Sequence, residues 1–384
     1  MKFNFGYLIL LSIFFPFVGF IPGIDTQPTF LLINFCLFFT QKLRKEAIII
    51  AFFLALLICI RLLFEIDQIN YRYTATYIVM VGNVIFMINL CLQNKFKYLD
   101  NKILIKFLAI YIIVAIVQYF YPNFLTFLTP RGSVNSEMIV STGRGLKSLT
   151  NEPSHFGKIL VIFNILFFII NKNLKFKYSI ILFLLNAFIP QSFYYLSIHI
   201  VVILLLYFNI KYISIIAFFF YLFINYYTKI ISDSSRVYYL ISTIIDDSSL
   251  IMQQGAFGRL YNIPITINNF VENIELLGFG NASNVFYTNI QTFFGEFNYT
   301  AQNRNLGGYI ELLLKMGILS FPIYLLYIYT LIKPLFKNFR LNFKIALCIL
   351  ILTINDGTVV NQLTLFLILF YYYYDNRSYS RSKT

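Results

Sequence analysis

The sequence predicts an all-α, polytopic integral membrane protein with about twelve transmembrane helices and two large extracytoplasmic loops. Hydrophobic residues make up 59% of the 384 residues, charged residues only 12%, and the mean hydropathy is +0.73. The apolar residues form long runs, and short links rich in lysine and arginine separate many of them. A soluble core of this length does not need so much apolar surface, whereas helices that cross lipid do.

Twelve runs are candidate spans by length and hydropathy. They cover residues 5–21, 28–41, 46–63, 74–93, 103–121, 155–171, 174–190, 192–208, 211–228, 305–332, 343–355 and 358–374. The runs 28–41, 174–190 and 343–355 are short or weakly bounded, so a count of ten or eleven also fits. The first run resembles a signal sequence, but it lacks a small-residue cleavage site and further spans follow. We interpret it as a retained first helix.

The basic residues of the links predict the orientation of the helices. Alternate links carry them: Lys42, Arg44 and Lys45; Lys95, Lys97 and Lys102; Lys172, Lys175 and Lys177; Lys211; Lys333, Lys337, Arg340 and Lys344; and, in the C-terminal tail, Arg377, Arg381 and Lys383. All of them face one side of the membrane if both termini are cytoplasmic, which agrees with the positive-inside bias. We therefore expect residues 1–384 to form a single transmembrane domain without a separate soluble domain.

Two links on the other side of the membrane are long. They are residues 122–152, the first outer loop, and residues 229–304, the second and larger outer loop. Long loops in a chain of otherwise minimal links usually carry function. The second loop contains an apolar stretch, Leu260 to Leu277, that lies on the membrane surface or forms a short helix. The sequence has no internal repeat, which argues against a transporter.

The outer loops contain cations that the positive-inside bias does not explain. The rigid planar fork of arginine suits bidentate binding of a phosphate or pyrophosphate. The alternative interpretation is solvated loop charge paired with nearby acidic residues. The candidate anion-binding residues are Arg131, Arg144, Lys147, Arg236, Arg259 and Arg304.

The most informative local string runs from Thr142 to Gly157, with the sequence TGRGLKSLTNEPSHFG. Asn151 and Glu152 are helix-capping residue types, and Pro153 suits the first turn, so a helix is expected to begin here. The free N–H groups and the dipole of a helix start make an anion site. Arg144 and Lys147 lie just upstream and could close over the same anion.

Glu152 and His155 are three residues apart and would share one face of this helix. Together they offer a carboxylate and an imidazole, either of which could accept a proton from a hydroxyl group. We favour Glu152 as the base because the helix cap would hold its carboxylate in place. The alternatives are an ion-pair role for Glu152 and an interfacial role for His155. His199 lies within an apolar run, and we interpret it as a neutral histidine bonded to a neighbouring helix.

Several classes of site are not indicated. Cys36, Cys59, Cys91 and Cys348 lie inside apolar runs without a CxxC pair, so neither a disulfide framework nor a zinc site is expected. The sequence has no Walker loop, GxSxG, HExxH or metal-spaced cluster, so we predict no metal and no cofactor. The net charge of +14 comes mostly from the short links, and the basic patch with interleaved aromatics typical of nucleic-acid binding is missing.

Several features together resemble one known family. They are a dozen spans, a large late outer loop and the Gly-Arg-Gly…Asn-Glu-Pro-Ser string that opens a helix in the middle of the chain. Three short motifs agree: Gln191-Ser192 opening a span after a short outer turn, the glycine step Leu277-Gly-Phe-Gly280, and the closing-helix pattern from Tyr309 to Gly317. The chain resembles the Wzy-type polymerases of O-antigen and capsular repeat units, which are relatives of the O-antigen ligases. The resemblance covers most of the chain by topology.

The resemblance implies a metal-independent membrane glycosyltransferase of the bacterial cytoplasmic (inner) membrane. The donor would be an oligosaccharide on undecaprenyl pyrophosphate, and the acceptor the terminal sugar of another lipid-linked repeat. The reaction would form a glycosidic bond on the outer face and release undecaprenyl pyrophosphate. A flippase and a chain-length regulator are the expected partners, together with the lipid bilayer. Glu152 or His155 would take the acceptor proton, and the arginines and Lys147 would bind the pyrophosphate and glycan.

Three alternatives stay open. An O-antigen ligase would share the scaffold, but ligases usually carry a His–Asn pair before the closing helix, and the stretch from Asn303 to Gly307 contains no histidine. A flippase or other transporter for lipid-linked oligosaccharides would more often show repeat symmetry and charged or broken helices at mid-membrane. A structural membrane protein without chemistry would not need arginine-rich outer loops.

Overall fold

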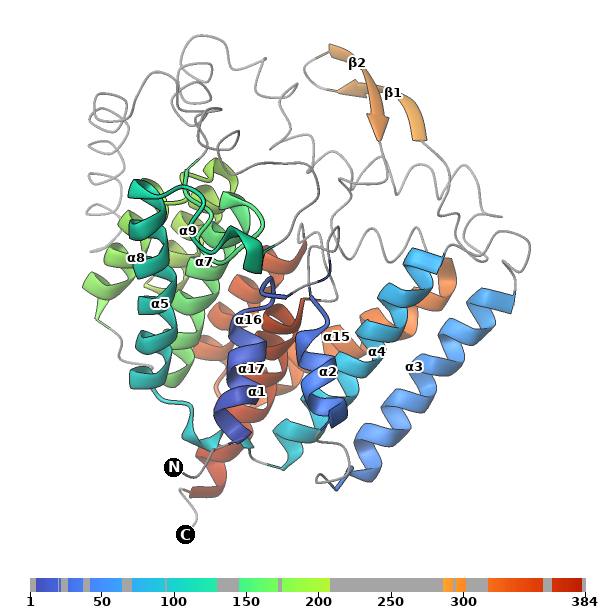
Figure 1. Ribbon diagram of the computed structural model, residues 1–384. Helices are drawn as coiled ribbons and strands as arrows, with labels where there is room; N and C mark the ends of the chain where they lie inside the picture. The colour runs from blue at the N-terminus through green and yellow to red at the C-terminus, as the bar shows by residue number, and fades with distance from the viewer. Residues whose placement is uncertain are drawn as a thin grey trace. The chain divides into compact units, whose positions relative to one another are not determined.

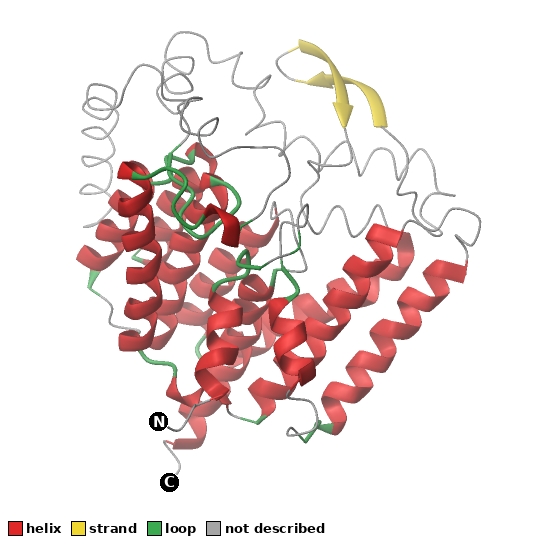
Figure 2. Cartoon of the chain, viewed as in Figure 1, coloured by secondary structure: helices red, strands yellow, loops and turns green. Residues whose placement is uncertain are grey.

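The computed structural model describes residues 5–19, 21, 27–36, 42–63, 71–93, 95–129, 145–171, 175–207, 286–292, 295–301, 317–354 and 361–381. These residues form eleven α-helices and one β-hairpin (Figures 1 and 2). The helices are α1 (Phe5–Phe14), α2 (Thr29–Cys36), α3 (Lys45–Leu63), α4 (Tyr71–Leu92), α5 (Asn101–Phe120), α7 (Pro153–Ile170), α8 (Phe176–Phe188), α9 (Phe193–Leu206), α15 (Phe321–Ile332), α16 (Phe339–Ile354) and α17 (Gln362–Arg381).

Each of these helices coincides with one of the predicted apolar runs, which confirms the all-helical part of the fold prediction. The predicted run 211–228 lies outside the described residues. Two helices, α5 and α7, are long and apolar enough to cross a membrane by length and composition, and several shorter helices are also apolar. The number of spans, their orientation and the single transmembrane domain stay predictions.

Some helix boundaries differ from the prediction for identifiable reasons. The first helix was expected to reach residue 21 but ends at Phe14, because Pro16 disfavours the helical conformation at the residue before it. At the other end of the chain, α17 continues to Arg381, past the predicted end at residue 374. It begins where the Asn361 side chain accepts hydrogen bonds from the backbone N–H groups of Leu363 and Thr364.

The chain divides into two compact units. Unit 1 contains residues 1–30, 96–251 and 340–349, and unit 2 contains residues 31–95, 252–339 and 350–384. In unit 1, α7 packs against α5, α8 and α9, and α8 also packs against α9 (Figure 1). Almost every side chain of α7 is buried, so this helix is the centre of the unit.

A cluster of buried polar side chains joins α7, α8 and α9. His199 on α9 lies between two asparagines: its Nε2 is 3.1 Å from Asn164 Nδ2 on α7, and its Nδ1 is 3.2 Å from Asn186 Nδ2 on α8. Ser179 on α8 is 2.7 Å from Asn164 Oδ1 and 2.9 Å from the Tyr207 hydroxyl. We call Asn164, Ser179, Asn186 and His199 the His199 cluster; all four are fully buried. The interpretation of His199 as a histidine bonded to a neighbouring helix is confirmed.

The outward faces of unit 1 are apolar. On α5, Ile105, Ile113, Ile116 and Phe120 recur at helical spacing and are all more than half exposed, with Ile113 at 58%. The exposed face of α8 likewise presents Tyr178, Ile181, Leu184 and Phe188. The unit therefore buries several polar groups inside an apolar core and exposes apolar helix faces, which is unusual in a soluble protein.

Unit 2 is built on helix pairs. Helix α3 packs on α4, and α17 packs against both α4 and α15. The chain before α3 is tied to α4: the Asn89 side chain accepts from the backbone N–H of Arg44 at 2.9 Å, and Gln93 donates to the Lys42 carbonyl. The Tyr327 hydroxyl on α15 is 2.5 Å from the Thr353 hydroxyl, and the Tyr371 hydroxyl on α17 donates to the Leu331 carbonyl at 3.4 Å.

The second predicted outer loop contains a β-hairpin that the sequence analysis missed. Strands β1 (Phe286–Thr292) and β2 (Gly295–Ala301) pair antiparallel, with Phe286 opposite Ala301 and Thr292 opposite Gly295. Aromatic and β-branched residues are frequent in both strands, which is the propensity signal that could have indicated them. The apolar stretch Leu260–Leu277 lies outside the described residues.

We expect the His199 cluster to stabilise unit 1. Replacing His199 with leucine leaves the Asn164 and Asn186 amides without their ring partner, which should lower the free energy of unfolding by about 1–3 kcal/mol. Thermal unfolding of the full chain in detergent measures this. The matched control is Ser197→Ala on the same helix, because the exposed Ser197 hydroxyl bonds only within its own helix, to the Phe193 carbonyl. Equal melting temperatures for the two variants would contradict a stabilising role.

Candidate functional site

The described part of the chain places three of the predicted site residues in unit 1. Lys147, Glu152 and His155 lie where the chain enters α7. The five arginines of the prediction lie outside the described residues: Arg131, Arg144, Arg236, Arg259 and Arg304. The site is therefore built from the start of α7 and from the segments that contact it.

The predicted start of α7 is confirmed. The helix begins at Pro153, and Glu152 occupies the N-cap position with extended backbone angles of φ −143° and ψ 153°. The Glu152 carbonyl accepts hydrogen bonds from the backbone N–H of His155 at 3.1 Å and from the Thr150 hydroxyl at 2.7 Å. The proline suits this position because its missing N–H has no intrahelical acceptor there.

The expected cap by the Glu152 carboxylate is wrong. No side-chain capping bond forms at this helix start; instead, Glu152 Oε2 accepts a hydrogen bond from the Ser154 hydroxyl at 3.0 Å. Glutamate has one methylene more than the aspartate that caps well, and its carboxylate does not fold back onto the first N–H groups. The half-buried carboxylate thus lies beside the positive end of the helix and is bonded to the Ser154 hydroxyl.

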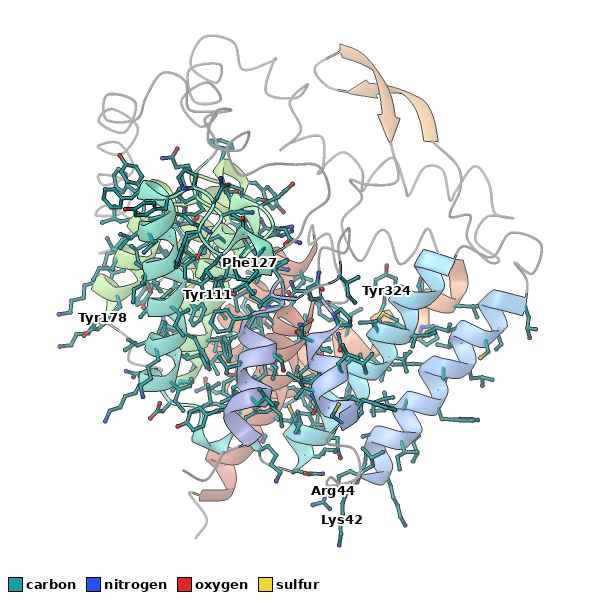
Figure 3. All side chains as sticks on the ribbon, in the orientation of Figure 1. Lys42, Arg44, Tyr111, Phe127, Tyr178 and Tyr324 are labelled. Atoms are coloured by element: carbon teal, nitrogen blue, oxygen red, sulfur yellow. The ribbon has the colours of Figure 1, made fainter. Side chains whose placement is uncertain are left out.

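A buried loop leads into the helix. Residues 145–151, here called the site loop, are held from two sides: Leu146 N–H donates to the Ile189 carbonyl at 2.8 Å, and Gln118 donates to the Ser148 carbonyl at 3.1 Å. The Ser148 hydroxyl donates in turn to the Tyr111 carbonyl on α5 at 2.6 Å (Figure 3 labels Tyr111). Ser148 has a left-handed φ of 53°, and these bonds keep it there.

Two lysines near the start of α7 are buried. Lys147, in the site loop, is 7% exposed, and Lys158, in the second turn of α7, is 1% exposed. The sequence analysis predicted an anion-binding role for Lys147 and did not select Lys158. An ionisable residue inside an apolar run is the signal that could have found it.

The His155 ring has a fixed orientation. It stacks on the ring of Phe17, with centroids 4.7 Å apart and an interplanar angle of 29°. Phe17 is almost fully buried, and its neighbour Phe15 stacks on Tyr111, so this contact is part of the core. His155 is half-buried in the first turn of α7, and the sequence analysis gave no indication of its aromatic partner.

Two glycines bring the site loop and α7 close to the connection between α8 and α9. A Cβ on Gly145 would lie 2.3 Å from the Ile189 carbonyl oxygen, and one on Gly157 would lie 2.9 Å from Asn186 Oδ1. Gly157 also faces the Cβ atoms of Ser192 and Tyr195. Part of the string that begins at Thr142 therefore lies against the Gln191-Ser192 turn, although the two segments are far apart in the sequence.

Among the described residues of unit 1, the exposed lysines lie at one end. The start of α7 lies beside the end of α5, the end of α8 and the start of α9. Exposed cations lie at the other end: Lys102 at the start of α5, and Lys175 and Lys177 at the start of α8. Lys344 of α16 lies there too, where it donates to the Leu206 carbonyl at the end of α9 at 3.4 Å.

The arrangement suits an anion and a proton acceptor side by side. The positive end of α7 favours negative charge, while Glu152 and His155 offer two groups that can accept a proton. Among the described residues, no group of histidine, cysteine, aspartate or glutamate could hold a metal ion. Comparison with protein-family models, with curated proteins and with solved structures found no match to this chain.

We expect Gly145→Ala to disturb the site. The new Cβ would meet the backbone of Ile189 and Pro190, which cannot rotate away, so the site loop must move. The expected loss is about 1–3 kcal/mol of unfolding free energy in detergent, the usual cost of overpacking. The control is Gly82→Ala on α4, where the nearest atoms belong to the Leu31 side chain, which can change rotamer. A Gly145→Ala protein as stable as the control would show that the close approach is not required.

Proposed function

We propose that this chain is an integral membrane glycosyltransferase that polymerises oligosaccharide repeat units carried on a polyprenyl pyrophosphate. The acceptor is the terminal sugar of another lipid-linked repeat, and the reaction takes place on the outer face of the bacterial cytoplasmic membrane. The proposal rests on the sequence resemblance described above and on the geometry at the start of α7. A polysaccharide chain-length regulator and a flippase are its proposed partners.

The exposed apolar helix faces support a membrane location. In unit 1 the exteriors of α5 and α8 are apolar, while amide, hydroxyl and imidazole groups are buried between helices. In lipid, polar groups must be satisfied inside the protein, and within the His199 cluster Asn164, Ser179 and His199 have buried partners. Helix α5 has 20 residues and α7 has 18, and about 20 residues of helix span a bilayer core.

One observation carries the choice of site. The site loop, the start of α7 and the turn before α9 converge at one end of unit 1, and the exposed lysines lie at the opposite end. If the basic end is cytoplasmic, then Glu152 and His155 lie at the outer surface, where lipid-linked repeat units are joined. The positive end of α7 is then available for the pyrophosphate.

The proposed reaction needs little from the protein beyond positioning. The acceptor hydroxyl oxygen forms a bond to the anomeric carbon, the bond from that carbon to the pyrophosphate oxygen breaks, and the polyprenyl pyrophosphate leaves with the electron pair. The hydroxyl proton passes to the Glu152 carboxylate. Pyrophosphate is a good leaving group once its charge is compensated, so cations and helix N–H groups supply the stabilisation.

Deletion of the gene tests the proposal directly. We expect the ladder of surface polysaccharide on a gel to collapse to a single repeat unit, because assembly of the unit does not depend on this chain. Loss of the complete glycan from its final anchor would instead indicate a ligase, and an unchanged ladder would contradict both.

The catalytic base is assigned by expressing variants of the protein in the deletion strain. Glu152→Gln keeps an oxygen that can accept from Ser154 but cannot take a proton, so polymer yield should fall about a hundredfold or more. His155→Gln should retain activity, as should the surface control Ser197→Ala, all compared at equal protein level in the membrane. An active Glu152→Gln with an inactive His155→Gln would assign the role to His155.

The orientation is tested by introducing one cysteine at a time. In the background the exposed Cys36 and Cys59 are replaced with serine, and the buried Cys91 and Cys348 are kept. Phe127→Cys lies beyond the end of α5, where Phe127 is 66% exposed, and Lys175→Cys lies at the opposite end of unit 1. An impermeant maleimide should label position 127 in intact spheroplasts and position 175 only after permeabilisation. The opposite labelling pattern would place Glu152 in the cytoplasm and exclude the proposed reaction there.

A further inference from the structure

Two pairs of helix ends in unit 2 are joined by side-chain hydrogen bonds. The chain before α3 is bonded to Asn89 and Gln93 at the end of α4. Lys333, which follows α15, donates to the Tyr372 hydroxyl of α17 at 2.9 Å. Helix α17 also packs against α4, so both pairs belong to one group of packed helices.

Exposed cations lie at these helix ends. Lys42, Arg44 and Lys45 precede or begin α3, and Lys333 follows α15; all four are exposed (Figure 3 labels Lys42 and Arg44). We call these four residues the basic collar. Lys337 lies one turn beyond Lys333, and Glu46 is the carboxylate in the same turn of α3. The collar keeps a clear excess of positive charge even with Glu46 counted.

Lys333 is held in one position by two tyrosines. Its amine is 5.1 Å from the centre of the Tyr329 ring and 5.3 Å from that of the Tyr372 ring, in addition to the bond to the Tyr372 hydroxyl. The two rings, on α15 and α17, are also in tilted contact with each other. Because an ammonium group has three N–H donors and Tyr372 takes one, the amine can still donate to an external acceptor. The cation is thus preorganised and exposed.

Apolar side chains begin directly beside the cations. On α15 and the turn that follows it, Leu325, Ile328, Ile332 and Phe336 are exposed, with Phe336 at 87%. On α3, Ile48, Ile49 and Phe52 are exposed next to Lys45. Tyrosines that lie between an apolar wall and a charged end are typical of the membrane–water interface. An acyl chain can therefore lie on the wall while its headgroup reaches the collar.

We propose that the basic collar binds the headgroup of an anionic phospholipid, with Lys333, Tyr329 and Tyr372 as its organised centre. Charge complementarity selects an anionic headgroup over a zwitterionic one, and the adjoining apolar wall selects a lipid over a free phosphate. The proposal rests on a membrane location but not on glycosyl transfer. It places this end of unit 2 in the leaflet that is rich in anionic lipid, which is the cytoplasmic one.

The test uses the purified full-length chain in a neutral detergent. It is titrated with phosphatidylglycerol, with phosphatidylcholine of the same acyl chains, or with inorganic phosphate, and the rise in melting temperature gives the apparent affinity. We expect stabilisation by phosphatidylglycerol at low concentration, weaker stabilisation by phosphatidylcholine, none by phosphate, and a loss of the difference in high salt. Equal effects of the two lipids, or an effect of phosphate alone, would overturn the proposal.

Matched variants locate the effect. Lys333→Gln should weaken the apparent affinity for phosphatidylglycerol about fivefold, the effect expected for one cation at an anionic surface. Lys177→Gln in unit 1 removes the same charge from another exposed lysine that lies over a tyrosine ring, 5.3 Å from the centre of Tyr178, and should leave the affinity unchanged. Equal losses in both variants would mean diffuse charge attraction and would overturn a defined site.

A second variant covers the case in which Lys333→Gln does not fold. Tyr372→Phe keeps the ring and the charge but removes the hydroxyl that positions the Lys333 amine. It should weaken phosphatidylglycerol binding about twofold and leave the response to phosphatidylcholine unchanged. An unaltered affinity in this variant would contradict the tyrosine-organised centre. Because polysaccharide synthesis is not measured, a failure here is distinguishable from a failure of the proposed enzyme activity.

Discussion

The hydrogen bonds around His199 are the constraint on which unit 1 depends. The His199 ring on α9 contacts one asparagine on α7 and another on α8. These contacts fix the positions of the three helices along one another. The Nδ2 atoms of both asparagines face the ring, whereas a neutral imidazole has one donor and one acceptor nitrogen, so one of the two amides must present its oxygen instead. Asn186 also lies against Gly157, two residues from His155, so the cluster is linked directly to the start of α7. The position of the start of α7 therefore depends on the buried polar groups of the His199 cluster.

Helix positions were predictable because each helix is an apolar run with a clear break. The start of α7 was predictable from Glu152 and Pro153, since capping position and proline preference are local properties. What the sequence did not indicate depends on three-dimensional neighbours. The Glu152 carboxylate accepts a hydrogen bond from Ser154 instead of capping the helix, the His155 ring stacks on Phe17, and the Lys147 side chain is buried, none of which is visible from sequence spacing. The hairpin β1–β2 was missed because helix-scale hydropathy does not detect two strands of seven residues each.

The glycines of the string beginning at Thr142 illustrate the same limit. In the sequence they are part of a family-like motif, and nothing in their spacing shows what they contact. In the structure Gly145 and Gly157 permit the approach of the α8–α9 connection, so at least these two positions have a packing reason. The candidate site is therefore an assembly of two sequence segments, and the glycine positions indicate where they meet. The arginines of the prediction belong to the residues that the structure does not describe.

The left-handed backbone of Ser148 has a consequence for how a ligand would associate with the site. Gln118 and Tyr111 already hold the site loop through Ser148, so its conformational entropy is lost during folding and not during binding. A ligand that docks against the start of α7 meets a preformed surface and spends little of its interaction energy on ordering the chain. Its rate of association should then be limited by diffusion in the plane of the membrane and by orientation, and its residence time should report the strength of the contacts themselves.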